Sequence, residues 1–287
     1  MLRQRGRMLS VFAANGPSVP LAAEPVFHVG PLAVTNSMLF GVITGIVVII
    51  IFMVAARKST LKPKSKFSFA VESLIDFLLN IAVENFSNRK QAYKHLPLLI
   101  TLFTFILFAN LSGLFPGVGT VVVATQNGQI PLLRAFTTDL NGTLALAVLT
   151  IVTVQFYAIK ELGIIGHLKH YFTDKPWNPM NLFIGLIEVM GEFIRILTLS
   201  MRLFGVIYAG EVLIHVMGEL AGNFGWAAMT PVYLMEVFFS VIQAYLFIML
   251  TTVYLSIATA HNSDSPEHED YKDHSNATIK PATDVIK

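Results

Sequence analysis

The chain contains no cysteine among its 287 residues, and only 13% of them are charged. The absence of cysteine excludes disulfide bonds, thiolate metal sites and a cysteine nucleophile. Soluble domains are near 25% charged, about twice this share. The chain is instead 54% hydrophobic with a mean hydropathy of +0.63. This composition predicts an integral membrane protein.

The sequence also lacks the common motifs of soluble enzymes. We find no P-loop, no Rossmann glycine pattern, no Gly-x-Ser-x-Gly and no His-Glu-x-x-His. The net charge of +2 and the lack of a basic tract with interleaved aromatic residues exclude a nucleic-acid partner. We therefore expect a protein that is not an enzyme, with no catalytic residues, no cofactor and no metal site.

Long apolar windows mark the membrane segments, and only the segment at 180–222 carries several charged residues. A helix needs about 20 residues to cross about 30 Å of hydrocarbon, at 1.5 Å per residue. The sequence predicts an all-α integral membrane protein that forms a single membrane domain with five inserted segments. These segments are 38–56, 98–115, 140–159, 180–222 and 231–260.

Basic residues near the segment ends set the expected orientation. Arg57 and Lys58 directly follow the first segment, and Lys160 follows the third. Because cytoplasmic loops are enriched in lysine and arginine, we expect the N-terminal segment 1–37 outside and the C-terminus in the cytoplasm.

Three stretches lie outside the predicted spans. Residues 1–23 resemble a targeting segment, and whether they are cleaved stays open. The stretch 67–86 has a polar residue every fourth position on an otherwise apolar helix, which fits an interfacial helix on the cytoplasmic side or a helix packed on a partner subunit. The polar stretch 261–287 is predicted to be a disordered cytoplasmic tail.

Arg202 lies inside the long apolar segment 180–222. Placing an arginine at membrane depth costs about 2.5–3.5 kcal/mol on insertion scales. Its guanidinium stays protonated, so it cannot escape this cost by losing its charge. A membrane protein that keeps such a charge usually provides a partner or an aqueous path. This residue predicts ion translocation, with a buried structural ion pair as the alternative.

The last two segments are predicted to form a long, tilted antiparallel hairpin. Glycines and Pro231 between them favour a turn. Pairing positions whose numbers sum to about 446 brings Arg202 level with Gln243 and Glu211 level with Glu236. Gln243 and Glu236 are seven residues apart and lie on one helix face.

Ionisable residues line each half of this hairpin. Glu211, His215 and Glu219 are spaced four apart on the outer half, and Glu188 and Glu192 lie on the inner half. The arrangement predicts one ion path from each side with an arginine between them. Glu192, Glu219 and His215 also fit a simpler role in helix packing, and Glu219 fits a position at the interface.

Several runs in one order resemble the a subunit of F-type ATP synthase, over about residues 24–260. The strongest is Leu199-Ser-Met-Arg-Leu-Phe-Gly-Val-Ile-Tyr-Ala-Gly-Glu211. The others are Glu24-Pro-Val-Phe-His28, Asn110-Leu-Ser-Gly-Leu-Phe-Pro116, Thr138-Asp-Leu-Asn-Gly-Thr-Leu-Ala145, Gln243-Ala-Tyr-Leu-Phe247 and Leu250-Thr-Thr-Val-Tyr-Leu-Ser256.

The resemblance implies a stator subunit that passes protons to and from a rotating c-ring. It implies partners in the c-ring, the b-type peripheral stalk and the rest of the F1F0 complex, within membrane lipid. By motif position, Arg202 resembles the essential arginine and Gln243 the glutamine at its level. Glu211 and Glu236, with His215, are assigned to the outer half-channel, and Glu188 to the inner one.

Two positions depart from the family pattern. Val206 stands where the family has asparagine, and Ile196 where it usually has proline. The first removes a polar group near Arg202. A sodium-translocating version of the subunit, an unrelated secondary transporter and a non-conducting scaffold are the alternatives. The N-terminal similarity favours a bacterial plasma membrane over an organellar membrane, and the size of the ring stays open.

Overall fold

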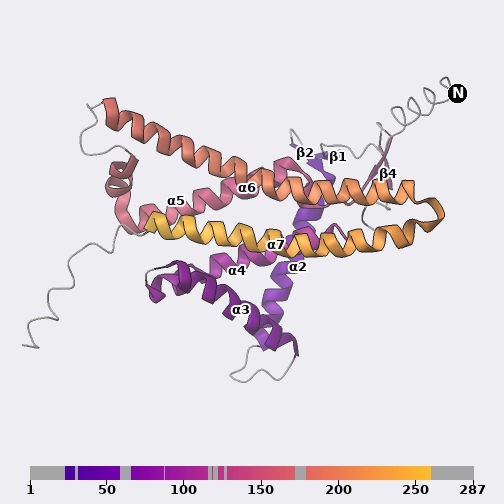
Figure 1. The fold of residues 1–287 in the computed structure, drawn as a ribbon, viewed down its shortest axis with the longest axis horizontal. Coiled ribbons are helices and arrows are strands. Elements are labelled where there is room, and N and C mark those ends of the chain that lie inside the picture. Colours follow the sequence, from indigo (N-terminus) through magenta and orange to yellow (C-terminus); the bar gives the residue numbers. More distant parts are fainter. Residues whose placement is uncertain are drawn as a thin grey trace, which may run out of the picture.

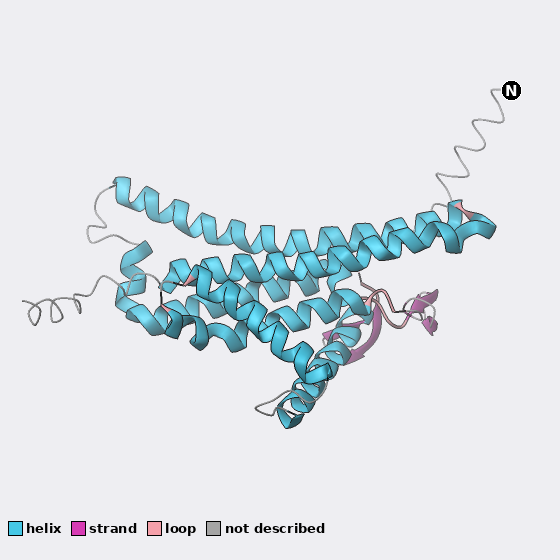
Figure 2. Cartoon of the chain, turned by 60° about the horizontal axis from the view of Figure 1, so that its bottom comes forward, coloured by secondary structure: helices cyan, strands magenta, loops and turns pink. Residues whose placement is uncertain are grey.

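A computed structural model describes residues 23–29, 32–58, 66–86, 88–115, 118, 122–125, 128–171 and 179–259. In these ranges the chain is almost entirely helical, with two small β-hairpins at one side (Figure 2). Five helices are long and apolar enough to cross a membrane, which confirms the predicted all-α membrane fold. The predicted segments 1–23 and 261–287 fall largely or wholly outside the described residues.

The helices follow the order of the predicted segments. The five candidate spans lie in α2, α4, α5, α6 and α7, and α3 corresponds to the predicted helix at 67–86. Their bounds are α2 Asn36–Lys58, α3 Lys66–Asn85, α4 Arg89–Ser112, α5 Leu140–Tyr171, α6 Pro179–Leu220 and α7 Gly225–Thr259.

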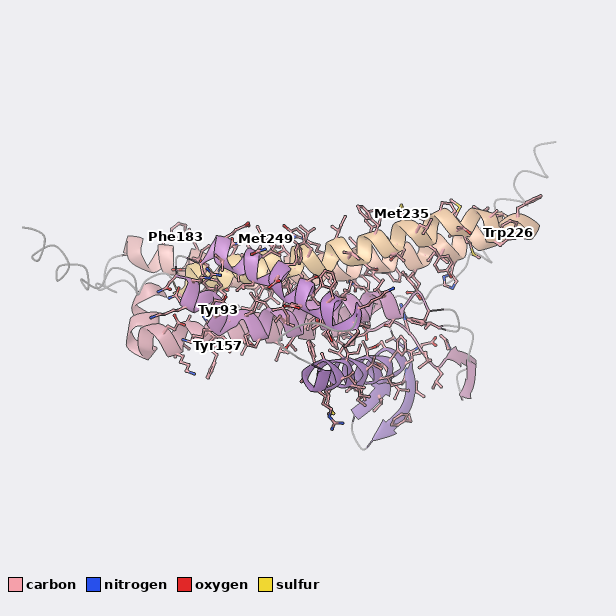
Figure 3. The ribbon with its side chains drawn as sticks, turned by 90° about the horizontal axis from the view of Figure 1, so that it is seen from below. Tyr93, Tyr157, Phe183, Trp226, Met235 and Met249 are labelled. Carbon is pink, nitrogen blue, oxygen red and sulfur yellow. The ribbon has the colours of Figure 1, made fainter. Side chains whose placement is uncertain are left out.

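The helices α6 and α7 form the predicted antiparallel hairpin. They run side by side along the length of the molecule, and α2 crosses them steeply (Figure 1). Trp226 lies at the turn end of the hairpin and Phe183 near the opposite end (Figure 3). A short helix at Gly222–Phe224 makes the turn, and Gly222 has a φ of 50°, which only glycine adopts without strain.

Two helix starts differ from the prediction. The helix α4 begins at Arg89, where the Asn88 side chain accepts a hydrogen bond from the Lys90 N–H. The sequence placed only the uncharged part, from 98, in the membrane segment. The helix α7 begins at Gly225, so Pro231 lies inside it and not in the turn. A proline in the second turn of a helix removes one backbone hydrogen bond, and its ring crowds the carbonyl four residues earlier.

The helix α5 is not continuous. At Gly163 the backbone has φ 75° and ψ 159°, which interrupts the helix beyond the membrane segment. Only glycine adopts a positive φ at low cost. The predicted span 140–159 lies wholly before this break.

Two β-hairpins were not predicted. The strands β1 Pro25–Val29 and β2 Leu32–Thr35 pair antiparallel, as do β4 Val122–Thr125 and β5 Gly128–Pro131. The hydroxyl of Ser37, at the start of α2, donates to Asp139 at 2.6 Å, just before α5. The Asn36 side chain donates to the carbonyl of Pro131, at the end of β5. These bonds fix the start of α2 against the α4–α5 connection.

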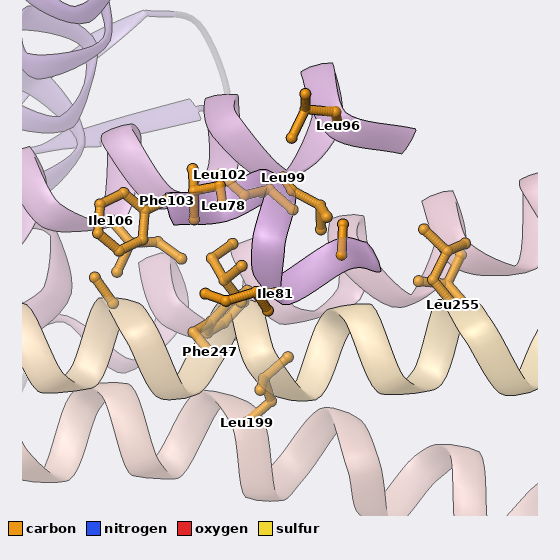
Figure 4. Close-up of a cluster of buried hydrophobic side chains, with 14 of the residues drawn as sticks. Leu78, Ile81, Leu96, Leu99, Leu102, Phe103, Ile106, Leu199, Phe247 and Leu255 are labelled. Atoms are coloured by element: carbon orange, nitrogen blue, oxygen red, sulfur yellow. The ribbon is translucent and has the colours of Figure 1, made fainter. Parts of the chain in front are cut away.

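A cluster of buried apolar side chains joins α3, α4, α6 and α7. Leu78 and Ile81 of α3 face Leu99 and Ile106 of α4, and Phe247 of α7 packs beneath them (Figure 4). The apolar face of α3 is thus buried against the protein. α3 is not among the candidate spans, in keeping with a helix outside the bilayer core.

Candidate functional site

The register of the α6–α7 hairpin matches the prediction. A Cβ atom at Gly210 would overlap the Glu236 carboxylate, a pair whose numbers sum to 446. A Cβ atom at Gly218 would come within 3.1 Å of Met229, a pair that sums to 447. The predicted alignment is therefore confirmed. The missing side chain of Gly210 is what lets the Glu236 carboxylate lie directly against α6.

The carboxylates of Glu211 and Glu236 line one cavity of about 70 Å³. A cavity needs about 10–15 Å³ of such space to hold one water molecule, so this one has room for several. Glu236 is only 2% exposed. In the described part of the chain, one oxygen of each carboxylate is buried without a hydrogen-bond partner. Buried polar oxygens require a donor, and the cavity has room for water to supply one.

Three polar residues that were not predicted from the sequence also line this cavity. They are Asn110 of α4, Thr138 before α5, and Tyr233 of α7. The Asn110 amide donates to the Ser240 carbonyl at 3.4 Å, while its own oxygen is buried and unpaired within the described residues. Asn110 and Thr138 each begin a run quoted above for the family resemblance, which was the available signal.

His215 does not join Glu211 and Glu236 at the cavity. Its ring is exposed, and its Nδ1 lies 2.8 Å from the Glu211 backbone carbonyl, one turn earlier on α6. A histidine bonded to its own helix has one nitrogen left for other partners. The structure does not describe the side chain of Glu219.

Arg202 and Gln243 lie at the same level of the hairpin but in different surroundings. Gln243 is buried, with its amide nitrogen unpaired among the described residues. The Arg202 side chain is exposed on the outer surface of α6, beside the exposed apolar residues Met201 and Leu197. In the described ranges no carboxylate forms an ion pair with Arg202. Its charge faces away from the chain.

The inner half of the hairpin has its own charged cluster. Arg195 pairs with Glu192, one turn earlier, and its guanidinium lies 4.9 Å from the centre of the Tyr254 ring of α7. Glu188 is half-buried one turn before Glu192. It lies 14 residues, or about 21 Å along the axis, from Arg202.

Taken together, the hairpin carries two separate groups of ionisable side chains. The outer group shares a cavity, the inner group lies near the start of α6, and Arg202 stands between them on the surface. Such groups bind and release protons or cations. Within the described residues, no cluster of three or more histidine or acidic residues is placed to hold a metal ion.

Comparison with known proteins gives a consistent picture. The family model described as ATP synthase A chain matches residues 38–256. A protein from Psychromonas ingrahamii named ATP synthase subunit a is 34% identical over 230 residues, covering 78% of this chain and 84% of that protein. A relative from Photobacterium profundum, ATP synthase subunit a 1, is 31% identical, and the match covers 87% of this chain and 99% of that protein. An ATP synthase subunit a from Desulforamulus reducens is 32% identical, and the match covers 86% of this chain and 89% of that protein.

Proposed function

The chain belongs to the ATP synthase A chain family, and we propose that it conducts protons through two half-channels to and from a rotating c-ring. Membership of this family makes it a multi-pass membrane subunit of the F1F0 complex that takes part in ion transport for ATP synthesis. Beyond family membership, we propose which ion is transported, which residues carry it, and how its passage is coupled to rotation of the c-ring. In it the chain has no catalytic residue, and the ATP chemistry belongs to other subunits.

The observation that carries the proposal is the exposed side chain of Arg202. An unpaired cation on an apolar, membrane-level surface is unfavourable unless something outside the chain compensates it. A carboxylate of a neighbouring rotor subunit is such a group. The exposed apolar residues around Arg202 provide a surface against which an apolar rotor helix can pack.

The outer half-channel begins at the cavity shared by Glu211 and Glu236. Two carboxylates at close range repel one another when both are ionised, and a proton held between them removes that repulsion. A proton enters through the water in this cavity, is held by the pair, and passes toward the rotor. In this scheme Asn110 and Thr138 orient the water, and His215 lies beside the path.

Arg202 separates the two half-channels. Its positive charge favours the ionised form of a carboxylate within about 4–6 Å, so it helps the arriving rotor carboxylate to release its proton. The same charge repels free cations and prevents a direct leak. Gln243 lies on α7 at the same level of the hairpin as Arg202. The released proton leaves past Glu188.

Each proton that crosses 100 mV contributes about 2.3 kcal/mol, so several protons are needed for one ATP. We assign the outer half-channel to the outside of the membrane, with the N-terminus, and the Glu188 side to the cytoplasm of a bacterium. The positive residues after the first and third spans support this orientation. A b-type peripheral stalk holds the subunit against the rotation of the ring.

The test is purification of the chain from its native membrane, followed by reconstitution of what co-purifies into vesicles. We expect an oligomeric ring, a stalk and a soluble ATPase, together with acidification of the vesicle lumen on ATP addition. Isolation of the chain as an active transporter without a ring would contradict the proposal.

A sodium titration at fixed pH identifies the ion. With protons as the substrate, ATP hydrolysis and lumen acidification are independent of sodium. Stimulation of hydrolysis by sodium, with sodium uptake in place of acidification, would establish the sodium-translocating alternative.

A further inference from the structure

A second cavity lies far from the charged residues of the α6–α7 hairpin. It occupies the corner between the end of α2, the start of α3 and the first half of α4, and its volume is about 590 Å³. Sites for small ligands are typically about 300–1,000 Å³. Figure 1 shows α3 running from the lower end of α2 toward α4, so that the three helices enclose this corner.

The walls of this cavity are almost wholly apolar. Phe52 of α2, Leu74 of α3 and Ile100 of α4 are typical of the lining. The hydroxyl of Thr104 is buried without a partner among the described residues, while the Thr101 hydroxyl donates to its own helix. Such a surface suits hydrocarbon better than water or a polar metabolite.

Two basic side chains flank the end of the cavity where α2 ends and α3 begins. Arg57 directly follows the lining residue Ala56 of α2, and Lys66 directly precedes the lining residue Phe67 of α3. Arg89 of α4 lies over the ring of the lining residue Tyr93, 5.8 Å from its centre, but near the opposite end of α3, because α3 extends for about 28 Å from Lys66 to Asn85. All three basic residues are exposed. The acidic residues of α3 begin only at Glu72, about 9 Å further along the axis from Lys66.

We propose that this corner binds an anionic glycerophospholipid. The acyl chain fills the apolar cavity, and the phosphate lies between Arg57 and Lys66. Basic pockets between membrane helices bind anionic headgroups by charge, and each Lys or Arg near the surface contributes about a fivefold gain in affinity.

The lipid has a structural consequence for the fold. The cavity lies between the end of α2 and the neighbouring parts of α3 and α4, and α2 exposes many large apolar side chains. An acyl chain in the corner fills the space that these helices leave between them. We therefore expect the bound lipid to fix the position of α2 against α3.

The experiment uses the assembled complex in phosphatidylcholine vesicles with two probes, spin-labelled phosphatidylglycerol and spin-labelled phosphatidylcholine. Electron paramagnetic resonance gives the immobilised fraction of each. We expect phosphatidylglycerol to be the more strongly immobilised. Arg57→Gln or Lys66→Gln should each lower its affinity by about fivefold. Lys160→Gln, which removes one exposed cation elsewhere, is the matched control and should have no effect.

Two further measurements test the cavity itself. Ala70→Phe fills it and should lower the immobilised fraction of both lipids. A photoreactive side chain at Thr101 in the assembled complex should form an adduct with phospholipid. Equal immobilisation of the two probes, insensitivity to the glutamine variants of Arg57 and Lys66, or an adduct with another protein chain would each overturn the proposal. The last result would assign the corner to a partner helix.

Discussion

The outer and inner halves of the α6–α7 hairpin hold their charges in different ways. In the outer half, Glu236 is buried against Gly210 and shares a cavity with Glu211. In the inner half, Arg195 is paired with Glu192 and lies on the Tyr254 ring. One half has carboxylate oxygens turned to a water-sized space, and the other has a cation already satisfied by its neighbours. In the proposed mechanism the two outer carboxylates transfer the proton, whereas Arg195 and Glu192 neutralise each other within the chain.

Arg202 fits neither half, since it is exposed and has no acidic partner in the described residues. Removing its charge is the change with the largest expected effect. In Arg202→Ala vesicles with verified assembly, ATP synthesis and ATP-driven acidification should fall to background, while passive proton leak under an imposed potential persists or rises. Arg202→Lys should not restore coupling, because an ammonium lacks the planar, multi-donor geometry of the guanidinium.

Loss of the Glu211 or Glu236 carboxylate is expected to have the second-largest effect on ATP-driven acidification. Glu211→Gln or Glu236→Gln should each lower ATP-driven acidification by about tenfold or more, as expected for loss of a positioned proton-transfer group. If the two act as a unit, the double variant is no slower than the slower single variant. Acidification at the normal rate by the double variant would remove both residues from the mechanism.

A substitution at Gly210 tests the contact that buries the Glu236 carboxylate against α6. Gly210→Ala places a methyl group where the carboxylate lies, and the flexible Glu236 side chain must move. We expect acidification to fall by roughly threefold to tenfold, because proton transfer depends steeply on position. Gly191→Ala on the same helix meets open space and is the matched control. Combining Gly210→Ala with the shorter Glu236→Asp should recover part of the rate.

Loss of the Arg195–Glu192 ion pair is expected to have the smallest effect on ATP-driven acidification. Arg195→Gln removes a partly exposed ion pair and a cation–π contact, each worth about 0.2–1 kcal/mol. We expect acidification to change by about twofold or less and resistance to thermal inactivation to fall slightly. Tyr254→Phe keeps the aromatic ring and should behave as the unchanged protein. A complete loss of pumping in Arg195→Gln would show that this arginine belongs to the ion path.

Much of the fold follows from the sequence because a bilayer imposes simple length and polarity requirements. Three of the five spans follow from uncharged windows, and the two spans of the hairpin follow from long apolar stretches that include charged residues. The hairpin register followed from matching Arg202 with Gln243 and Glu211 with Glu236. The start of α7 was missed because Pro231 was assigned to the turn. The two β-hairpins were missed because their strands are four or five residues long.

The candidate site was less predictable. Asn110 and Thr138 line the outer cavity but carry no charge, so hydropathy gave no reason to select them. The outward direction of Arg202 could not be inferred, because residues on every side of it are apolar and lipid-facing positions do not differ in polarity from buried ones. The spacing that predicted His215 beside Glu211 agrees with the contact of its Nδ1 with the Glu211 carbonyl, but spacing could not show that the ring is exposed and does not line the cavity.

The central claim, two half-channels separated at Arg202, is tested most directly by sided labelling in the assembled complex. Because the chain has no cysteine, one introduced cysteine is its single thiol. Ile214→Cys lies in the outer cavity, and Gly191→Cys lies one turn from Glu188, where its side chain meets open space. A membrane-impermeant thiol reagent should reach Ile214→Cys only from outside and Gly191→Cys only from the cytoplasmic side. Labelling of either position equally from both sides would contradict the account.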